Sequence, residues 1–173
     1  PYDFDDDCGE ARVAGFDRFS KLLKESVDRI TTQDDGNTLD YVLNKIEKDA
    51  GSLPQTPDDA VQMIQGQIRY ILHDPAISRA RKMLVIEQFQ NPELANLQTK
   101  QNYSDVLGYF TGLIKCLIQK GVLAEDAPEI MAAQFCLPIS VWINLCDRDP
   151  EREQEVMELV DKHIRQFFRV YGK

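Results

Sequence analysis

A repeated pair of a capping residue and a proline constrains the fold more than any other feature of the sequence. Thr56-Pro57, Asp74-Pro75 and Asn91-Pro92 each place a side-chain acceptor directly before a proline. The acceptor can bind free N–H groups in the first turn of a helix, where the missing N–H of proline costs nothing. Apolar residues then recur three and four positions apart, and no stretch alternates as a strand does. The sequence therefore predicts an all-α protein.

The helices are expected between these starts and the turn residues that interrupt the apolar pattern. Gly121 follows the longest segment and is expected to end it in the left-handed conformation. The expected helices span residues 10–30, 38–49, 57–73, 75–89, 92–120, 127–146 and 150–171.

The composition of the chain argues against some classes of partner and cofactor. Its 173 residues suffice for one buried core, and 20 basic against 29 acidic residues give a net charge of −9. This surface as a whole repels the phosphate backbone of a duplex. The four cysteines stand far apart without a C-x-x-C pair, so neither a zinc site nor a disulfide framework is indicated, and no cofactor is expected.

Two further expectations concern the location of the protein. No uninterrupted apolar run approaches the ~18 to 20 residues that span a bilayer, and residues 1–10 are acidic rather than basic and then apolar. We therefore interpret residues 1–10 as an acidic remnant or linker, and we expect no membrane partner. A cytoplasmic protein with reduced thiols is the simplest interpretation.

The last two helices predict a dimer. Residues 130–143 are apolar on nearly every side, and the closing helix carries a wide apolar stripe. Two such helices from each of two copies, packed around a two-fold axis, would bury the apolar face that one subunit leaves uncovered. The alternative is that both helices form the centre of a monomeric bundle. The residues expected at the interface are Phe135, Ile139, Trp142, Ile143, Val156, Val160, His163, Ile164 and Phe167.

The interior is expected to combine aromatic, small and polar side chains, a mixture that can hold a small ligand. Aromatic rings would surround such a ligand, and polar groups would orient it through hydrogen bonds, among them Gln62, Gln88, Asn102, Thr111 and Gln134. The alternative is that these aromatic residues are plain core. The candidate ligand-binding residues are Phe19, Met63, Tyr70, Phe89, Tyr103, Phe110, Thr111 and Gln134.

Catalytic and metal-binding motifs are not found. The aspartate run at residues 3–7 resembles the start of a calcium loop, but Cys8 and Ala14 occupy the positions that need glycine and glutamate. The sequence has no nucleophile elbow, no H-E-x-x-H and no phosphate-binding glycine loop. His163 stands among apolar residues and is interpreted as a core or interface histidine. We therefore predict no catalytic residue and no metal.

Several short motifs follow one another in a fixed order through the second half of the chain. They are Asp74-Pro75-Ala76-Ile77, Asn91-Pro92-Glu93-Leu94, Gln119-Lys120-Gly121-Val122-Leu123, Ala132-Ala133-Gln134-Phe135 and Asp149-Pro150-Glu151-Arg152. In this order, residues 74–171 resemble the C-terminal domain of TetR/AcrR-family transcriptional regulators. The resemblance implies that residues 11–173 form an effector-binding and dimerisation domain, a helical bundle whose last two helices make a four-helix dimer interface.

The N-terminal helix-turn-helix of that family, with its A-x-x-x-G turn and Y-x-x-F end, is not found in these residues. The resemblance implies a ligand-responsive repressor that forms a homodimer, binds a small-molecule effector and touches operator DNA only through a segment not present here. Residues 10–30 and 57–73 would transmit the effector signal. Two alternatives stay open, a helical dimerisation adaptor without a ligand and a small helical enzyme.

Overall fold

The computed structural model describes residues 53–173. The helices expected at 10–30 and 38–49, the acidic residues 1–10 and the candidate residue Phe19 lie outside this part of the chain.

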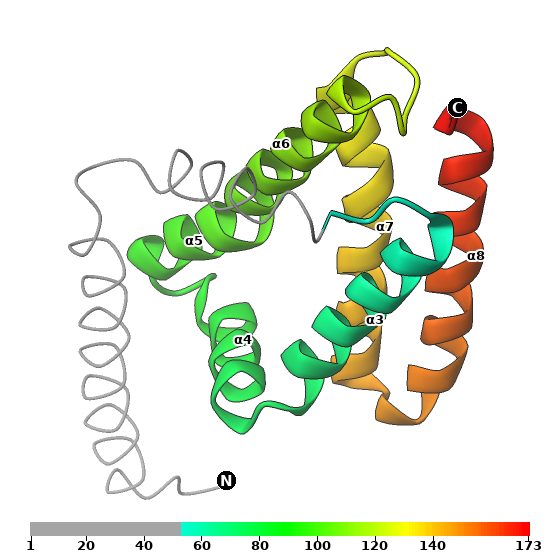
Figure 1. Cartoon of the computed structure of the whole chain (residues 1–173). Helices are drawn as coiled ribbons and strands as arrows, with labels where there is room; N and C mark the ends of the chain where they lie inside the picture. Colours follow the sequence, from blue (N-terminus) through cyan, green and yellow to red (C-terminus); the bar gives the residue numbers. More distant parts are fainter. Residues whose placement is uncertain (1–52) are drawn as a thin grey trace, which may run out of the picture. The chain divides into compact units, whose positions relative to one another are not determined.

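Residues 53–173 fold as helices joined by short turns (Figure 1), and this part of the chain contains no strand, only an isolated bridge between Leu123 and Gly172. The all-α prediction is confirmed. The elements are α3 (Pro57–His73), α4 (Pro75–Glu87), α5 (Pro92–Thr99), the π-helical turn η1 (Lys100–Ser104), α6 (Asp105–Gln119), α7 (Pro128–Arg148), the 3-10 turn η2 (Pro150–Arg152) and α8 (Glu153–Tyr171).

The capping residues act as the sequence predicts. Thr56 Oγ1 accepts from the backbone N–H of Asp59 at 3.1 Å, and the Asp59 carboxylate accepts from the backbone N–H of Thr56 at 3.0 Å. This reciprocal capping box lowers the pKa of Asp59, because both hydrogen bonds to Thr56 favour the charged carboxylate. Asp74 and Asn91 each accept from two backbone N–H groups in the first turns of α4 and α5. The three predicted helix starts are confirmed.

The end of α6 also follows the prediction. Gly121 has φ +74°, the left-handed conformation that favours glycine. Its N–H donates to the carbonyl of Ile118 at 2.9 Å, and the N–H of Val122 donates to the carbonyl of Leu117 at 2.9 Å. These two bonds form a Schellman motif, which ends the helix and turns the chain toward α7.

One difference from the prediction lies inside the segment expected as a single helix over 92–120. The structure inserts η1 between α5 and α6, where the N–H of Asp105 donates to the carbonyl of Lys100, five residues earlier. Such a turn holds more residues than an α-helical turn and changes which side chains face the interior beyond it. The apolar period of the sequence does not reveal this insertion.

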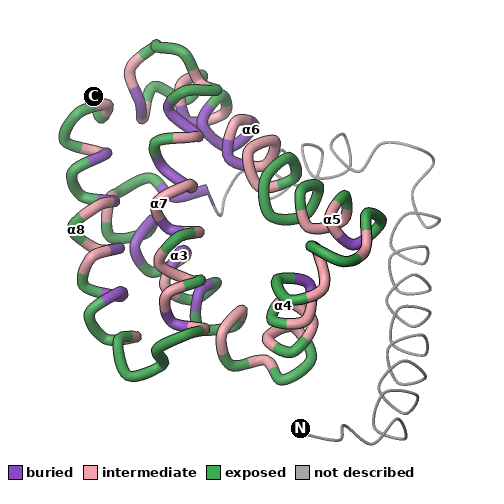
Figure 2. Tube along the Cα trace, turned by 180° about the vertical axis from the view of Figure 1, so that it is seen from behind, coloured by how far each residue is buried: buried purple, intermediate pink, exposed green. Residues whose placement is uncertain are grey.

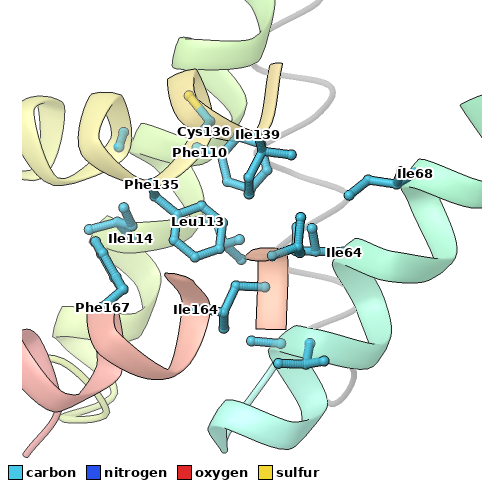
Figure 3. Close-up of a cluster of buried hydrophobic side chains, with 14 of the residues drawn as sticks. Ile64, Ile68, Phe110, Leu113, Ile114, Phe135, Cys136, Ile139, Ile164 and Phe167 are labelled. Atoms are coloured by element: carbon cyan, nitrogen blue, oxygen red, sulfur yellow. The ribbon is translucent and has the colours of Figure 1, made fainter. Parts of the chain in front are cut away.

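The core brings together segments that are far apart in the sequence. Figure 3 shows Ile64 and Ile68 of α3 pointing toward Phe110 of α6 and Ile139 of α7. The rings of Phe110 and Phe135 lie 5.3 Å apart, and those of Phe135 and Phe167 lie 5.0 Å apart. This row of rings joins α6, α7 and α8, and ring pairs at such distances add to the stabilisation from burial alone.

Helix α7 is long and apolar enough, by length and composition, to cross a bilayer, although its apolar residues do not form one uninterrupted run. The core helix of a soluble protein satisfies the same test. Six residues of α7 are buried in this core: Met131, Ala132, Phe135, Cys136, Ile139 and Cys146. This single helix does not indicate a membrane protein.

Candidate functional site

A cavity of about 520 Å³ lies among α3, α4, α5–η1–α6 and α7. Its apolar wall comes from α3, α6 and α7, and Figure 3 shows part of that wall, where Ile64 and Ile68 face Phe110 and Ile139. A volume of this size lies within the range of small-molecule sites in proteins. The apolar wall residues are Ile64, Ile68, Ile71, Val106, Phe110, Cys136, Ile139 and Ile143.

The rest of the lining is polar and consists mainly of side-chain amides. We call the carboxamide rim the five residues Gln67, Gln98, Gln101, Asn102 and Asn144. Asn102 Nδ2 donates to Gln98 Oε1 at 2.8 Å, so part of the rim is held in place by its own members. The hydroxyl groups of Ser140 and Tyr109 stand beside the rim.

Tyr109 connects the rim to the core. Burial raises the pKa of its hydroxyl, and a hydrogen bond with the Gln67 side chain offsets part of that rise. The ring of Tyr109 also packs edge-on against Phe110, with ring centres 5.1 Å apart. The phenol is therefore neutral at physiological pH and is available as a hydrogen-bonding group at the cavity wall.

Two charged side chains line the cavity, and each has an opposite charge beside it. Arg81 Nη2 donates to Asp147 Oδ2 at 2.5 Å and its Nη1 donates to Asp147 Oδ1 at 3.4 Å. These two side chains are only 16% and 11% exposed, and they tie α4 to the end of α7. Asp105 accepts from Lys100 Nζ at 3.1 Å in a more exposed pair. The lining therefore presents no charge without a partner.

The π-helical turn lies at the cavity. Gln101 and Asn102 belong to η1, and Gln98 and Asp105 flank it on either side. All four side chains line the cavity, so η1 and its flanks supply much of the polar lining. π-helical turns occur often at functional sites, because the extra residue redirects side chains that a regular helix would place elsewhere.

The cavity is better equipped to bind than to react. Burial raises the pKa of the Cys136 thiol to about 11, so this wall residue is not a nucleophile at neutral pH. Within residues 53–173 no group of three or more His, Cys, Asp or Glu side chains is placed to hold a metal ion.

The family of the chain is decided by a comparison with protein-family models. Residues 60–173 match the family described as AefR-like transcriptional repressor, C-terminal domain. The chain belongs to the TetR family. This confirms the resemblance seen over residues 74–171, and the family is one of transcriptional regulators. Neither the curated proteins nor the solved structures contain a match to the chain.

In the structure of this TetR-family domain, only some of the candidate ligand-binding residues lie at a cavity. Phe110 lines the cavity, and Met63 and Phe110 border a second, much smaller hollow. Tyr70, Phe89 and Tyr103 are exposed, Phe89 to 86%, and do not line the cavity. The remaining described candidates, Thr111 and Gln134, also lie outside the lining, and Gln134 accepts from the Tyr171 hydroxyl at 2.6 Å.

The sequence analysis missed most of the polar lining. Arg81 and four members of the carboxamide rim, Gln67, Gln98, Gln101 and Asn144, were not among the candidates. A signal was present, because Gln67, Gln98 and Asn144 each stand beside the apolar stripe of their own helix. Polar residues at the edge of an apolar stripe are usually solvated, however, so the pattern alone does not mark them.

The residues predicted for the dimer interface are placed mainly inside the protomer. Six of the nine are buried within it: Phe135, Ile139, Val156, Val160, Ile164 and Phe167. Trp142, Ile143 and His163 are half-buried. The ring of His163 packs edge-on against Trp142, and its Nε2 donates to the carbonyl of Phe135 at 2.9 Å, so this histidine has its partners within the chain.

Apolar surface nevertheless remains on α7 and α8. Val141 of α7 is 62% exposed, and Ile130 of α7 and Val170 of α8 are exposed to a similar degree. Leu137 and Leu145 are half-buried and follow the same helical spacing as Val141. We call the α7 stripe the row Ile130, Leu137, Val141 and Leu145.

Proposed function

We propose that this TetR-type regulator chain is the effector-sensing and dimerising part of a ligand-responsive transcriptional repressor that acts in the cytoplasm. The observation that carries the proposal is the cavity of about 520 Å³, which is lined by the apolar wall and by the carboxamide rim. An apolar cavity with a few convergent polar groups is the usual form of a small-molecule site. In this proposal operator DNA is read by a helix-turn-helix element of the family type.

The cavity favours a sensor over the two alternatives. An adaptor that only docks partners would have its core filled to the density of a protein interior, whereas this core leaves room for a ligand. An enzyme would need titratable groups with pKa values moved toward neutrality. Burial moves the pKa of Tyr109 and of Cys136 the other way, upward from values that already lie above neutrality.

The way in which the cavity is built suggests how a ligand acts. Arg81 on α4 lines the cavity and also ties α4 to Asp147 at the end of α7. Helix α4 has only one buried residue, Leu84, so little else holds it in place (Figure 2). We infer that an effector repositions α4 and α3 relative to α7. To release DNA, the effector must bind the DNA-incompetent arrangement more tightly than the DNA-competent one. Equal affinity for both arrangements would leave the equilibrium between them unchanged.

The second part of the proposal is a homodimer formed through α7 and α8. The support is the α7 stripe, because its spacing of seven and four residues keeps it on one face of the helix, as packing against a second helix requires. Val141 is the most exposed member of this stripe, at 62%. In the proposed dimer the α7 stripe and Val170 meet the same surface of a second copy, and the six buried residues of α7 and α8 support that surface from within.

The dimer is tested by small-angle scattering and by light scattering after size exclusion. The 173-residue chain is expected to behave as a dimer, and Val141→Glu is expected to behave as a folded monomer, because two charges would be buried at the interface. Gln62→Glu on the exposed side of α3 is the matched control and should leave the dimer unchanged. A monomeric wild-type chain at high concentration refutes this part of the proposal.

The sensing function is tested by a thermal-shift screen against a panel of metabolites and drugs. A ligand that binds the folded chain raises the melting temperature by mass action. Val106→Trp fills the cavity from α6 and should abolish the shift, whereas Gln62→Trp, outside the cavity lining, should not. A panel that shifts neither the wild type nor the control contradicts the sensing function.

A further inference from the structure

We propose that the effector of this cavity is an amphipathic molecule with an uncharged polar head, and that carboxylate and ammonium heads are rejected. This inference rests on the proposed sensing function and specifies its ligand. It is drawn from the charge balance of the lining, from the hydrogen-bonding groups of the carboxamide rim and from the apolar wall.

The charge balance argues against a charged ligand. The lining contains one positive group, Arg81, and one negative group, Asp105. Arg81 is bound by both oxygens of Asp147, and Asp105 is paired with Lys100. A ligand carboxylate that took Arg81 would leave Asp147 unpaired at 11% exposure, and an unpaired buried charge is strongly unfavourable. An anion therefore gains little from the one cation of the cavity.

A cationic ligand meets a similar difficulty. Asp105 is the one carboxylate of the lining, and it already accepts from Lys100. This pair is about half exposed, so it is weak and screened by water. A ligand cation that replaced Lys100 would lose its own hydration on entering the cavity and would gain only an exposed contact. Arg81 in the same lining further disfavours a second positive charge.

The carboxamide rim suits an uncharged head. Each side-chain amide offers two donor hydrogens and one acceptor oxygen, so the rim can match amide, alcohol or carbonyl groups in either direction. The side-chain amides of Gln101 and Asn144 make no hydrogen bond within residues 53–173, which leaves both available to a ligand. The phenol of Tyr109 adds one further neutral group, held beside Gln67.

The apolar wall accommodates the rest of the molecule. Its members come from α3, α6 and α7 and are isoleucine, valine, phenylalanine and a protonated cysteine, none of which offers a strong hydrogen-bonding group. An alkyl or ring portion placed against them would be removed from water, at roughly 25 cal/mol for each Å² of apolar surface buried. An apolar body and a neutral polar head together match the two kinds of side chain in the lining.

The proposal is tested with three probes that share one alkyl chain and differ only in the head. They are decanamide, decanoate and decylammonium, titrated calorimetrically into the 173-residue chain at the same ionic strength. The amide is expected to bind at least roughly tenfold more tightly than either ion. Gln101→Ala should weaken binding of the amide, while Gln62→Ala, on the exposed side of α3, should not.

Charge substitutions at the rim give a readout that a purely structural role would not produce. Asn144→Asp introduces an unpaired negative charge and should improve binding of decylammonium. Asn144→Lys introduces a positive charge and should improve binding of decanoate. Each gain is expected to be on the order of threefold, because Asn144 is exposed and its charge would be screened.

The outcomes separate this inference from the sensing function on which it rests. If decanoate or decylammonium binds the wild type as tightly as the amide, and Val106→Trp abolishes that binding, the cavity is a ligand site but the inference of a neutral head is overturned. If none of the three probes binds the wild type, both the inference and the sensing function are contradicted. If the amide binds the wild type more tightly than either ion, and Gln101→Ala removes this preference, the neutral-head inference and the sensing function are both supported.

Discussion

Removing the guanidinium of Arg81 is expected to destabilise the chain far more than removing an exposed arginine. Arg81→Met keeps the apolar stem of the side chain and leaves the Asp147 carboxylate without its partner. Deleting one partner of a fully buried pair costs about 3 to 5 kcal/mol, and the residual exposure of 16% and 11% lowers this to about 2 to 3 kcal/mol. With an m-value near ~2 kcal/mol per molar, the urea midpoint should fall by on the order of 1 M.

The assay is urea unfolding followed by far-UV circular dichroism, and Arg152→Met is the matched control. Arg152 donates to both oxygens of Glu155, but these side chains are 43% and 50% exposed, so the midpoint should hardly move. The double variant Arg81→Met with Asp147→Leu should recover most of the loss, because no buried charge remains. If Arg81→Met lowers the urea midpoint no more than Arg152→Met does, the pair of Arg81 with Asp147 does not hold α4 against α7.

Three further predictions follow from single groups. Thr56→Ala should lower the free energy of unfolding by about 1 kcal/mol in urea melts, because it removes the hydroxyl that caps α3. Thr56→Ser keeps a capping hydroxyl and should retain most of the wild-type stability. Stability should decline as the pH rises from 9 to 11, since the folded chain keeps the Cys136 proton that the unfolded chain releases, and Cys136→Ala should flatten that decline. At neutral pH a thiol reagent should modify Cys116 well before Cys136 and Cys146, because the latter two thiols are buried and their pKa values are raised. Mass spectrometry of the native chain measures the three rates, and equal rates would contradict the burial of Cys136 and Cys146.

Within residues 53–173, the local signals in the sequence were sufficient to predict three helix starts and the end of α6. Thr56, Asp74 and Asn91 cap as predicted, and Gly121 ends α6 with a positive φ. Caps and turns depend on a few neighbouring residues, so their physics is complete within a short stretch of sequence. The π-helical turn η1 was missed, because it changes the hydrogen-bonding pattern without a distinctive residue type.

The cavity could not be predicted with the same success. The ion pair of Arg81 with Asp147 joins residues that are 66 positions apart, and nothing near either residue indicates the other. Tyr70, Phe89 and Tyr103 were expected in the lining because aromatic residues favour the interior, yet the helices turn them outward. Which face of a helix meets which neighbour is decided by tertiary packing, and periodicity gives only the existence of a face.

The dimer prediction was limited in the same way, because an apolar face in the sequence does not show what packs against it. The apolar stripes of α7 and α8 were interpreted as interface, and Val156, Val160 and Ile164 are instead fully buried inside the protomer. A stripe that packs within one chain and a stripe that packs between two chains have the same composition. The exposed fraction of each side chain, such as that of Val141, is known only from the structure.

The packing of α3 against α8 has a consequence for how the protein is made. Ile64 and Ile68 enter the core early in the described chain, whereas Val160 and Ile164 of α8, buried in that same core, are synthesised almost a hundred residues later. During synthesis, the part of the apolar face of α3 that packs against α8 stays uncovered until α8 has emerged from the ribosome. Nascent chains that still lack α8 are therefore the species that a chaperone would hold, and the core is complete only once α8 is available.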